Sequence, residues 1–220
     1  MADQSVRPVI VKRFTLDVQV AHWAVAISFI LLLISGLGMF YGGLFFLTGV
    51  FGGGETTRQV HPWIGVVLSV AFFWLCIRFM PITLWARDDA AWLMHLRQSL
   101  SGREEDLPEA GKFNAGQKIY FWGMALLVLI LLVTGLLTWY RYFGAATSIQ
   151  TQRVMAVFHS IAAILAILAF IVHVHMVTWE RGTLRAMTRG AVTAGWGWKH
   201  HRKWLREVGR KGKTRARTAE

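Results

Sequence analysis

The chain has 220 residues, of which 55% are hydrophobic, and it carries 24 Lys and Arg against 12 Asp and Glu. Soluble domains are somewhat less apolar, and here the excess lies in long runs, so the composition argues against a soluble core and favours a membrane protein. A net charge of +12 is also compatible with nucleic-acid binding. The basic residues lie beside the apolar runs, however, which argues against that class.

Four apolar runs are each long enough to cross a hydrocarbon core of about 30 Å as a helix. We expect spans at about residues 20–41, 60–81, 116–140 and 154–179. The predicted fold is therefore all-α, a single integral membrane domain over residues 1–220 built as a four-helix bundle. The lone cysteine, Cys76, cannot form an internal disulfide and is expected to pack within the second span.

The polar connections differ in length and charge. Residues 82–112 form the one sizeable polar loop, which we expect to hold a short amphipathic helix from Asp88 to Leu100. Residues 180–220 form a basic tail. Its tryptophans fit an interfacial segment in contact with anionic lipid: Trp196, Trp198 and Trp204.

Lys and Arg are distributed unevenly around the spans. Twelve follow Trp179, six lie in or beside the 82–112 loop, and three precede the first span. Only Arg58, Arg141 and Arg153 flank the other two connections. The positive-inside rule therefore places both termini and the 82–112 loop in the cytoplasm. The first span is too long for a signal sequence and lacks a small-residue cleavage site, so we expect it to be retained.

Four histidines lie in the spans at two depths. His22 opens the first span near the cytoplasmic face, and His61 opens the second near the other face. His159 and His173 lie 14 residues apart on the fourth span, which on a helix is roughly 21 Å and almost four turns, so both face one way. Matching depths pairs His61 with His159 and His22 with His173. Such pairs suit the irons of two haems b stacked across the bilayer, and bis-histidine ligation leaves no site for O₂, which favours electron transfer.

Other interpretations of these histidines stay open. A single intramembrane histidine is often a packing residue or part of a proton relay, so a haem-free transporter or proton channel is an alternative. Zinc is disfavoured, because its sites need three or four close ligands and these depths offer no Cys or carboxylate. His175 lies about 160° around the helix from His159, against about 40° for His173, so it faces a propionate, a quinone or a partner helix instead. The remaining histidines are expected at the surface: His95, His200 and His201.

Two glycines also fit haem binding. Gly36 lies 14 residues after His22, on the same helix face and at the depth of the other haem, and Gly65 lies one turn beyond His61. A residue without a side chain lets a flat macrocycle approach the backbone. Glycine is equally common at contacts between membrane helices, so both interpretations of Gly36 and Gly65 stay open.

The entry to the third span is polar. Asn114 followed by Gln117 three residues later resembles a capping box. The same two amides can bind a quinone carbonyl at the depth of the His22–His173 pair. The two roles are compatible.

These motifs resemble those of a known family, the γ subunit (cytochrome b) of membrane-bound respiratory formate dehydrogenases. The shared residues run through nearly the whole chain: His22-Trp23, His61-Pro62, GKFNAGQK at 111–118, LLVTG at 131–135, His159, His173 and KHHRKWLRE at 199–207. The four-span, four-histidine plan alone is also found in the cytochrome b subunits of nickel–iron hydrogenases and related anchors, so a hydrogenase or another molybdoenzyme is the alternative donor.

The resemblance implies a place in the bacterial inner membrane and in a chain of electron carriers. Formate would be oxidised on a molybdenum or tungsten α subunit in the periplasm. Electrons would then pass through an iron–sulfur β subunit and this chain to menaquinone or ubiquinone on the cytoplasmic side, near Asn114, Gln117 and His173. The family complex is a heterotrimer that can assemble further. The chain would bind no nucleic acid, and it would not oxidise formate on its own.

Overall fold

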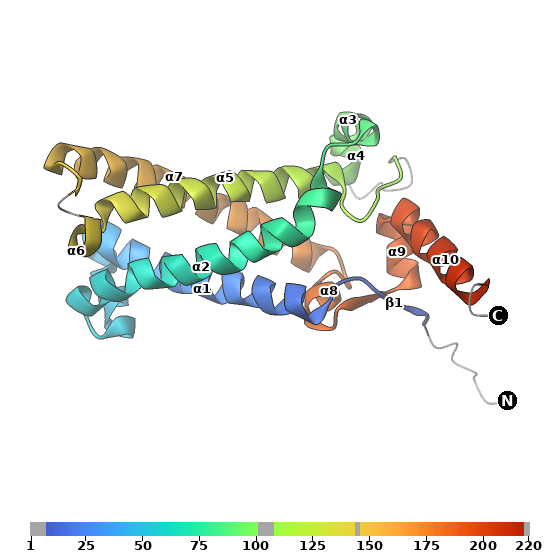
Figure 1. The fold of residues 1–220 in the computed structure, drawn as a ribbon, viewed down its shortest axis with the longest axis horizontal. Coiled ribbons are helices and arrows are strands. Elements are labelled where there is room, and N and C mark those ends of the chain that lie inside the picture. Colours follow the sequence, from blue (N-terminus) through green and yellow to red (C-terminus); the bar gives the residue numbers. More distant parts are fainter. Residues whose placement is uncertain (1–7, 101–107, 144–145, 218–220) are drawn as a thin grey trace. The chain divides into compact units, whose positions relative to one another are not determined.

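The computed structural model describes residues 8–100, 108–143 and 146–217. In chain order the elements are β1 (Ile10–Lys12), α1 (Leu16–Phe40), the 3₁₀ helix η1 (Gly42–Phe51), α2 (Gly54–Thr83), α3 (Arg87–Met94), α4 (Leu96–Leu100), α5 (Ala115–Thr138), α6 (Tyr140–Phe143), α7 (Ile149–Trp179), α8 (Leu184–Thr188), β2 (Ala191–Thr193), α9 (Ala194–His200) and α10 (Arg202–Arg217). Figure 1 shows these elements.

The four predicted spans are confirmed as helices α1, α2, α5 and α7. Among the described residues these four are long and apolar enough to cross a membrane, with mean hydropathies from 2.0 to 2.6. The chain is therefore an integral membrane protein with an all-α core. The helices α1, α2 and α7 begin earlier than predicted, at Leu16, Gly54 and Ile149. In α1 and α2, the first-turn acids Asp17 and Glu55 interact favourably with the positive end of the helix dipole.

The chain forms two compact units. Unit 2 comprises Asp17–Arg78 and Trp122–Met176, and thus holds most of the four long helices. Unit 1 comprises Met1–Leu16, Phe79–Phe121 and Val177–Glu220, and thus holds the loop, the tail and the ends of the long helices that adjoin them.

Small residues lie inside unit 2 and large apolar residues lie outside. Ser35, Ala162 and Ala166 are at most 4% exposed. Val70 and Phe73 on α2 are each 66% exposed, as expected for side chains that face lipid. Small residues at helix contacts let backbones approach closely, which is how membrane helices pack in the absence of a hydrophobic driving force.

Unit 1 contains a two-stranded ribbon that the sequence did not predict. β1 pairs antiparallel with β2, with Val11 opposite Val192. The tail folds instead of lying open at an interface: Trp196 is 9% and Trp204 6% exposed, whereas Trp198 is 52% exposed. The interfacial prediction is therefore wrong for Trp196 and Trp204, because both indole rings contribute to the core of unit 1.

The surface prediction is also wrong for His201, which is 1% exposed. His200 is half-buried, with Nε2 3.4 Å from Glu180 Oε2, and His95 is half-buried with Nδ1 2.8 Å from the Ala91 carbonyl oxygen. The amphipathic helix expected from Asp88 to Leu100 is present as two pieces, α3 and α4, which break at His95.

Candidate functional site

Two histidine pairs lie within unit 2. His61 on α2 and His159 on α7 have ring centroids 6.3 Å apart, with an interplanar angle of 66°. His22 on α1 and His173 on α7 also have centroids 6.3 Å apart, at 48°. We call these the outer pair and the inner pair. The structure thus brings together the pairs that depth matching predicted, and their binding of iron stays a prediction.

The separation of the rings fits one metal between each pair. A metal–imidazole bond is about 2 Å long, and the ligating nitrogen lies about 1 Å from its ring centre, so two rings on opposite sides of one iron have centroids roughly 6 Å apart. Both pairs meet this requirement. Among the described residues no group of three or more His, Cys, Asp or Glu is arranged to hold a metal ion.

His173 and His175 differ in their surroundings. His173 is half-buried and faces His22, whereas His175 is exposed. The ring near His22 is thus that of His173, as the helical phase predicts, and the role of His173 as an iron ligand stays a prediction.

Two hydroxyl groups that the sequence analysis missed contact the outer pair. Ser35 Oγ on α1 lies 2.7 Å from His61 Nδ1, and Thr134 Oγ1 on α5 lies 2.9 Å from His159 Nδ1. In the sequence, each is a polar residue followed by a glycine within an apolar run, and this pattern could have identified both residues. Both are buried in the structure.

The inner pair has a different environment. His22 Nδ1 is buried and has no hydrogen-bond partner among the described residues. The ring of Trp23 stands edge-on to that of His22, with centroids 5.6 Å apart. Among the described residues, the inner pair thus lacks at His22 the hydroxyl contact that both rings of the outer pair make.

The two predicted glycines have different surroundings. A Cβ added to Gly36 would lie 3.5 Å from His61 Cε1, so Gly36 adjoins the outer pair as expected. A Cβ added to Gly65 would meet no atom within 4 Å. Gly135 was not predicted, yet a Cβ there would lie 3.4 Å from His159 Cε1. These are ordinary contacts, so the rings themselves do not require glycine.

In unit 1, the predicted capping box at the start of α5 is confirmed. Gln117 N donates to Asn114 Oδ1 at 2.8 Å, and Asn114 N donates to Gln117 Oε1 at 3.1 Å. The box uses the oxygen of each amide. The NH₂ group of each side chain remains suited to donate to a carbonyl such as that of a quinone.

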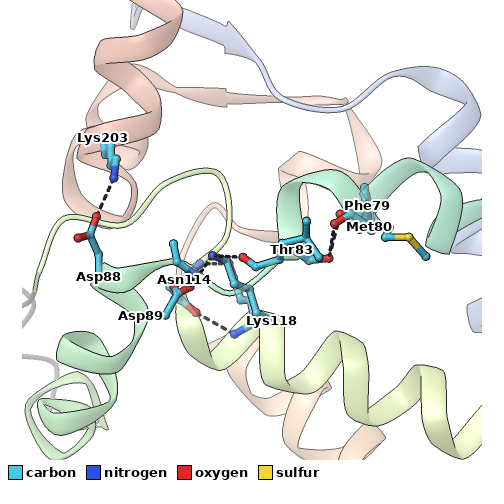
Figure 2. Close-up of polar contacts among 11 residues, drawn as sticks. Phe79, Met80, Thr83, Asp88, Asp89, Asn114, Lys118 and Lys203 are labelled. Atoms are coloured by element: carbon cyan, nitrogen blue, oxygen red, sulfur yellow. Dashed lines mark hydrogen bonds and ion pairs between the residues drawn. The ribbon is translucent and has the colours of Figure 1, made fainter.

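A pocket in unit 1 adjoins this helix start, and Figure 2 shows its polar contacts. Its lining includes Asn114 but not Gln117, together with acidic and basic side chains: Asp88, Asp89, Glu109, Lys112, Lys118 and Lys203. Lys118 Nζ bonds Asp89 Oδ2 at 2.7 Å in a pair whose side chains are each 8% exposed, and it also donates to the Leu84 carbonyl at 3.0 Å. Lys203 pairs with Asp88 nearer the solvent, also at 2.7 Å.

Comparison with known proteins agrees with this geometry. The family model for prokaryotic cytochrome b561 matches residues 13–190, which include all four long helices. The chain belongs to this family, among the cytochrome b subunits of formate dehydrogenase. It is 35% identical over 187 residues to the cytochrome b556(Fdn) subunit of the nitrate-inducible formate dehydrogenase of Escherichia coli K12, which covers 85% of this chain and 86% of the relative.

Two further relatives carry the same description. The cytochrome b556(fdo) subunit of formate dehydrogenase from Escherichia coli K12 is 36% identical over 196 residues, covering 89% of this chain and 92% of the relative. The formate dehydrogenase cytochrome b556 subunit of Haemophilus influenzae is 32% identical over 189 residues, covering 86% and 79%. The family resemblance seen in the motifs is thus confirmed. The chain is a cytochrome b subunit that takes part in electron transport.

Proposed function

We propose that this chain is a di-haem cytochrome b subunit that carries electrons from the periplasmic iron–sulfur subunit of a formate dehydrogenase to a quinone near the cytoplasmic face. The two histidine pairs in unit 2 carry the proposal. They share one helix, α7, on which their members lie 14 residues or roughly 21 Å apart, as two redox centres in series within one bilayer require.

His61 with His159 and His22 with His173 would hold the two irons. Two haems b would supply one-electron redox chemistry there. With both histidines of a pair bound, no position would remain for O₂ or substrate, so the residues would restrict the centres to electron transfer. Gly36 and Gly65 are proposed to leave room for the macrocycles along α1 and α2.

Charge distribution supports the orientation. Unit 1 carries 20 of the 24 Lys and Arg, all except Arg58, Arg78, Arg141 and Arg153. By the positive-inside rule unit 1 would face the cytoplasm, with both termini. Its basic side chains would also attract anionic lipid in the bacterial inner membrane.

The amides of Asn114 and Gln117 are the proposed quinone contacts. The capping box occupies their oxygens, and their NH₂ groups would donate to a quinone carbonyl. The resemblance to respiratory formate dehydrogenases supports this assignment, as does the position of both residues at the basic end of α5.

The relatives' names support association with other formate dehydrogenase subunits. We propose an iron–sulfur β subunit as the direct donor and a molybdenum- or tungsten-containing α subunit as the site of formate oxidation. Assembly into a higher oligomer of the heterotrimer would follow the family pattern.

Haem content and spin state of the purified complex test the proposal. We expect two haems b per chain with two low-spin bis-imidazole EPR signals. His61→Ala and His159→Ala should each remove one haem, and His22→Ala and His173→Ala the other, while His175→Phe keeps both. A colourless wild-type protein made with ample haem would instead support the proton relay. A nickel–iron subunit that co-purifies would replace formate with hydrogen as the donor.

A further inference from the structure

The outer pair is held by the same short motif on two helices. Leu33-Ile34-Ser35-Gly36-Leu37 on α1 and Leu132-Val133-Thr134-Gly135-Leu136 on α5 share the pattern Leu, β-branched residue, hydroxyl residue, Gly, Leu. In both, the hydroxyl contacts Nδ1 of a histidine on a neighbouring helix and the glycine faces Cε1 of the same ring. The histidines follow at nearly the same distance in sequence, 26 and 25 residues later.

The direction of each hydrogen bond follows from counting protons. Ser35 Oγ donates to the Leu31 carbonyl at 2.8 Å, and Thr134 Oγ1 donates to the Ile130 carbonyl at 2.6 Å. A hydroxyl has one proton, and these helical carbonyls take it. With the proton used in this way, the oxygen accepts from the imidazole. We therefore assign His61 and His159 the tautomer with the proton on Nδ1, which leaves the Nε2 lone pair of each ring free to bind a metal.

Both hydroxyls are well shielded from water. Ser35 is 0% and Thr134 5% exposed. Water is thus excluded as a competing acceptor at these bonds, and a buried hydrogen bond of this kind fixes the tautomer and the orientation of the ring.

We propose that Ser35 and Thr134 are positioning residues for the outer haem, each acting through its histidine ligand to lower the haem's reduction potential. This inference rests on the proposed function. A hydrogen bond from Nδ1–H makes the imidazole a stronger donor, which stabilises ferric over ferrous iron. The inner pair lacks the matching contact at His22, whose Nδ1 has no partner among the described residues. The difference favours electron flow from the outer to the inner centre.

A competing explanation is that each hydroxyl only satisfies its own helix. Serine and threonine commonly bond the carbonyl one turn back, and other hydroxyls in these helices do so. Ser69 Oγ donates to the Gly65 carbonyl at 2.8 Å, and Thr138 Oγ1 donates to the Thr134 carbonyl at 3.0 Å. Ser69 and Thr138 are therefore matched controls for Ser35 and Thr134.

The experiment is a redox titration of both haems in the purified complex, with EPR of the low-spin signals, for Ser35→Ala and Thr134→Val. The controls are Ser69→Ala and Thr138→Val, and the conservative replacements are Ser35→Thr and Thr134→Ser. Loss of one haem in His61→Ala identifies the outer signal. We expect the outer midpoint potential to rise and its EPR signal to shift in both test variants, with a larger rise in the double variant. The controls and the inner haem should not change.

Unchanged midpoints in Ser35→Ala and Thr134→Val, with both haems present, would overturn the inference. An equal change in the control variants or a shift confined to the inner haem would also overturn it. If a test variant loses the outer haem, retention of that haem by the conservative replacement supports positioning through the hydroxyl, and its loss there too refutes it. Absence of haem from the wild-type protein would instead refute the proposed function.

Discussion

The side chains of Arg13 and His201 meet inside unit 1 although they are 188 positions apart, with Arg13 Nη2 3.1 Å from His201 Nε2. The opposite ring nitrogen, Nδ1, lies 2.7 Å from the Gly111 carbonyl oxygen and donates to it. Nε2 therefore accepts from the guanidinium, and the imidazole is neutral. The contact ties the segment before α1, the loop before α5 and the start of α10 into one core.

Replacing Arg13 should loosen that core. Its guanidinium also donates to the Lys112 carbonyl and lies 4.8 Å and 4.7 Å from the ring centres of Trp196 and Trp204. We expect Arg13→Ala to destabilise unit 1 by about 2–4 kcal/mol, because charged hydrogen bonds and buried cation–π contacts are lost together. Faster proteolysis of the tail in detergent would show this. Lys12→Ala removes the same charge from the exposed neighbouring position, and equal protease sensitivity of both variants would contradict the prediction.

His201 should make stability fall in mild acid. Burial, followed by the charge of Arg13, lowers the pKa of His201 to about 3, against about 6.5 in an unfolded chain. Between these values the unfolded state binds a proton that the folded state excludes, so stability is lost as the pH falls. The loss is about 1.4 kcal/mol for each pH unit in that window. The midpoint of thermal unfolding of unit 1 should drop accordingly from pH 6.5 downward.

Comparison with His201→Gln isolates the contribution of the His201 ring to the pH dependence of stability. Glutamine does not titrate, so the variant is expected to be less stable at neutral pH but to lose less stability between pH 6.5 and pH 5. His95→Gln is the control, because the His95 ring bonds the carbonyl of Ala91 in its own segment. If His201→Gln and the wild type have parallel pH profiles, the ring is not the group responsible.

The buried pair of Lys118 and Asp89 should behave unlike the exposed pair of Lys203 and Asp88. Asp89→Ala leaves an unpaired charge on a lysine whose side chain is 8% exposed, so we expect a loss of about 3–5 kcal/mol. Adding Lys118→Met should recover much of that loss, since both charges are then gone. Asp88→Ala is the matched control and should change the unfolding midpoint little, although Lys203 lowers the pKa of Asp88. Additive losses in the Asp89→Ala, Lys118→Met cycle would contradict the argument.

The sequence was sufficient to predict the features that follow from periodicity and depth. Long apolar runs fix the spans, and helical geometry fixes which histidines face the same way, so both pairs and the rejection of His175 needed no tertiary information. The capping box was equally local, since Asn114 and Gln117 bond each other.

Features that depend on contacts between distant segments were not predictable. Three-residue strands such as β1 and β2 have too few residues for a periodic signal. The burial of His201 requires Arg13 and Gly111, which lie 188 and 90 positions away. The hydroxyls of Ser35 and Thr134 resemble ordinary helix back-bonding residues until the neighbouring helix brings a histidine to them.

The last prediction separates helix capping from quinone binding at the start of α5. Asn114→Asp and Gln117→Glu keep the side-chain oxygen that closes the capping box, and both acids are good residues in those positions. Each replaces an NH₂ donor by a second acceptor, which cannot bond a quinone carbonyl. We therefore expect wild-type stability and haem content, and full reduction of both haems by formate. Quinone reduction should fall at least tenfold, which corresponds to the loss of about 1.4 kcal/mol from one hydrogen bond.

Two assays separate quinone reduction from haem reduction: steady-state turnover with quinone, and single-turnover reduction of the haems by formate. The control is Ser148→Ala, which alters a hydroxyl just before α7. Wild-type quinone reduction in both acidic variants would limit Asn114 and Gln117 to capping. A parallel loss of haem reduction would place the defect before the quinone.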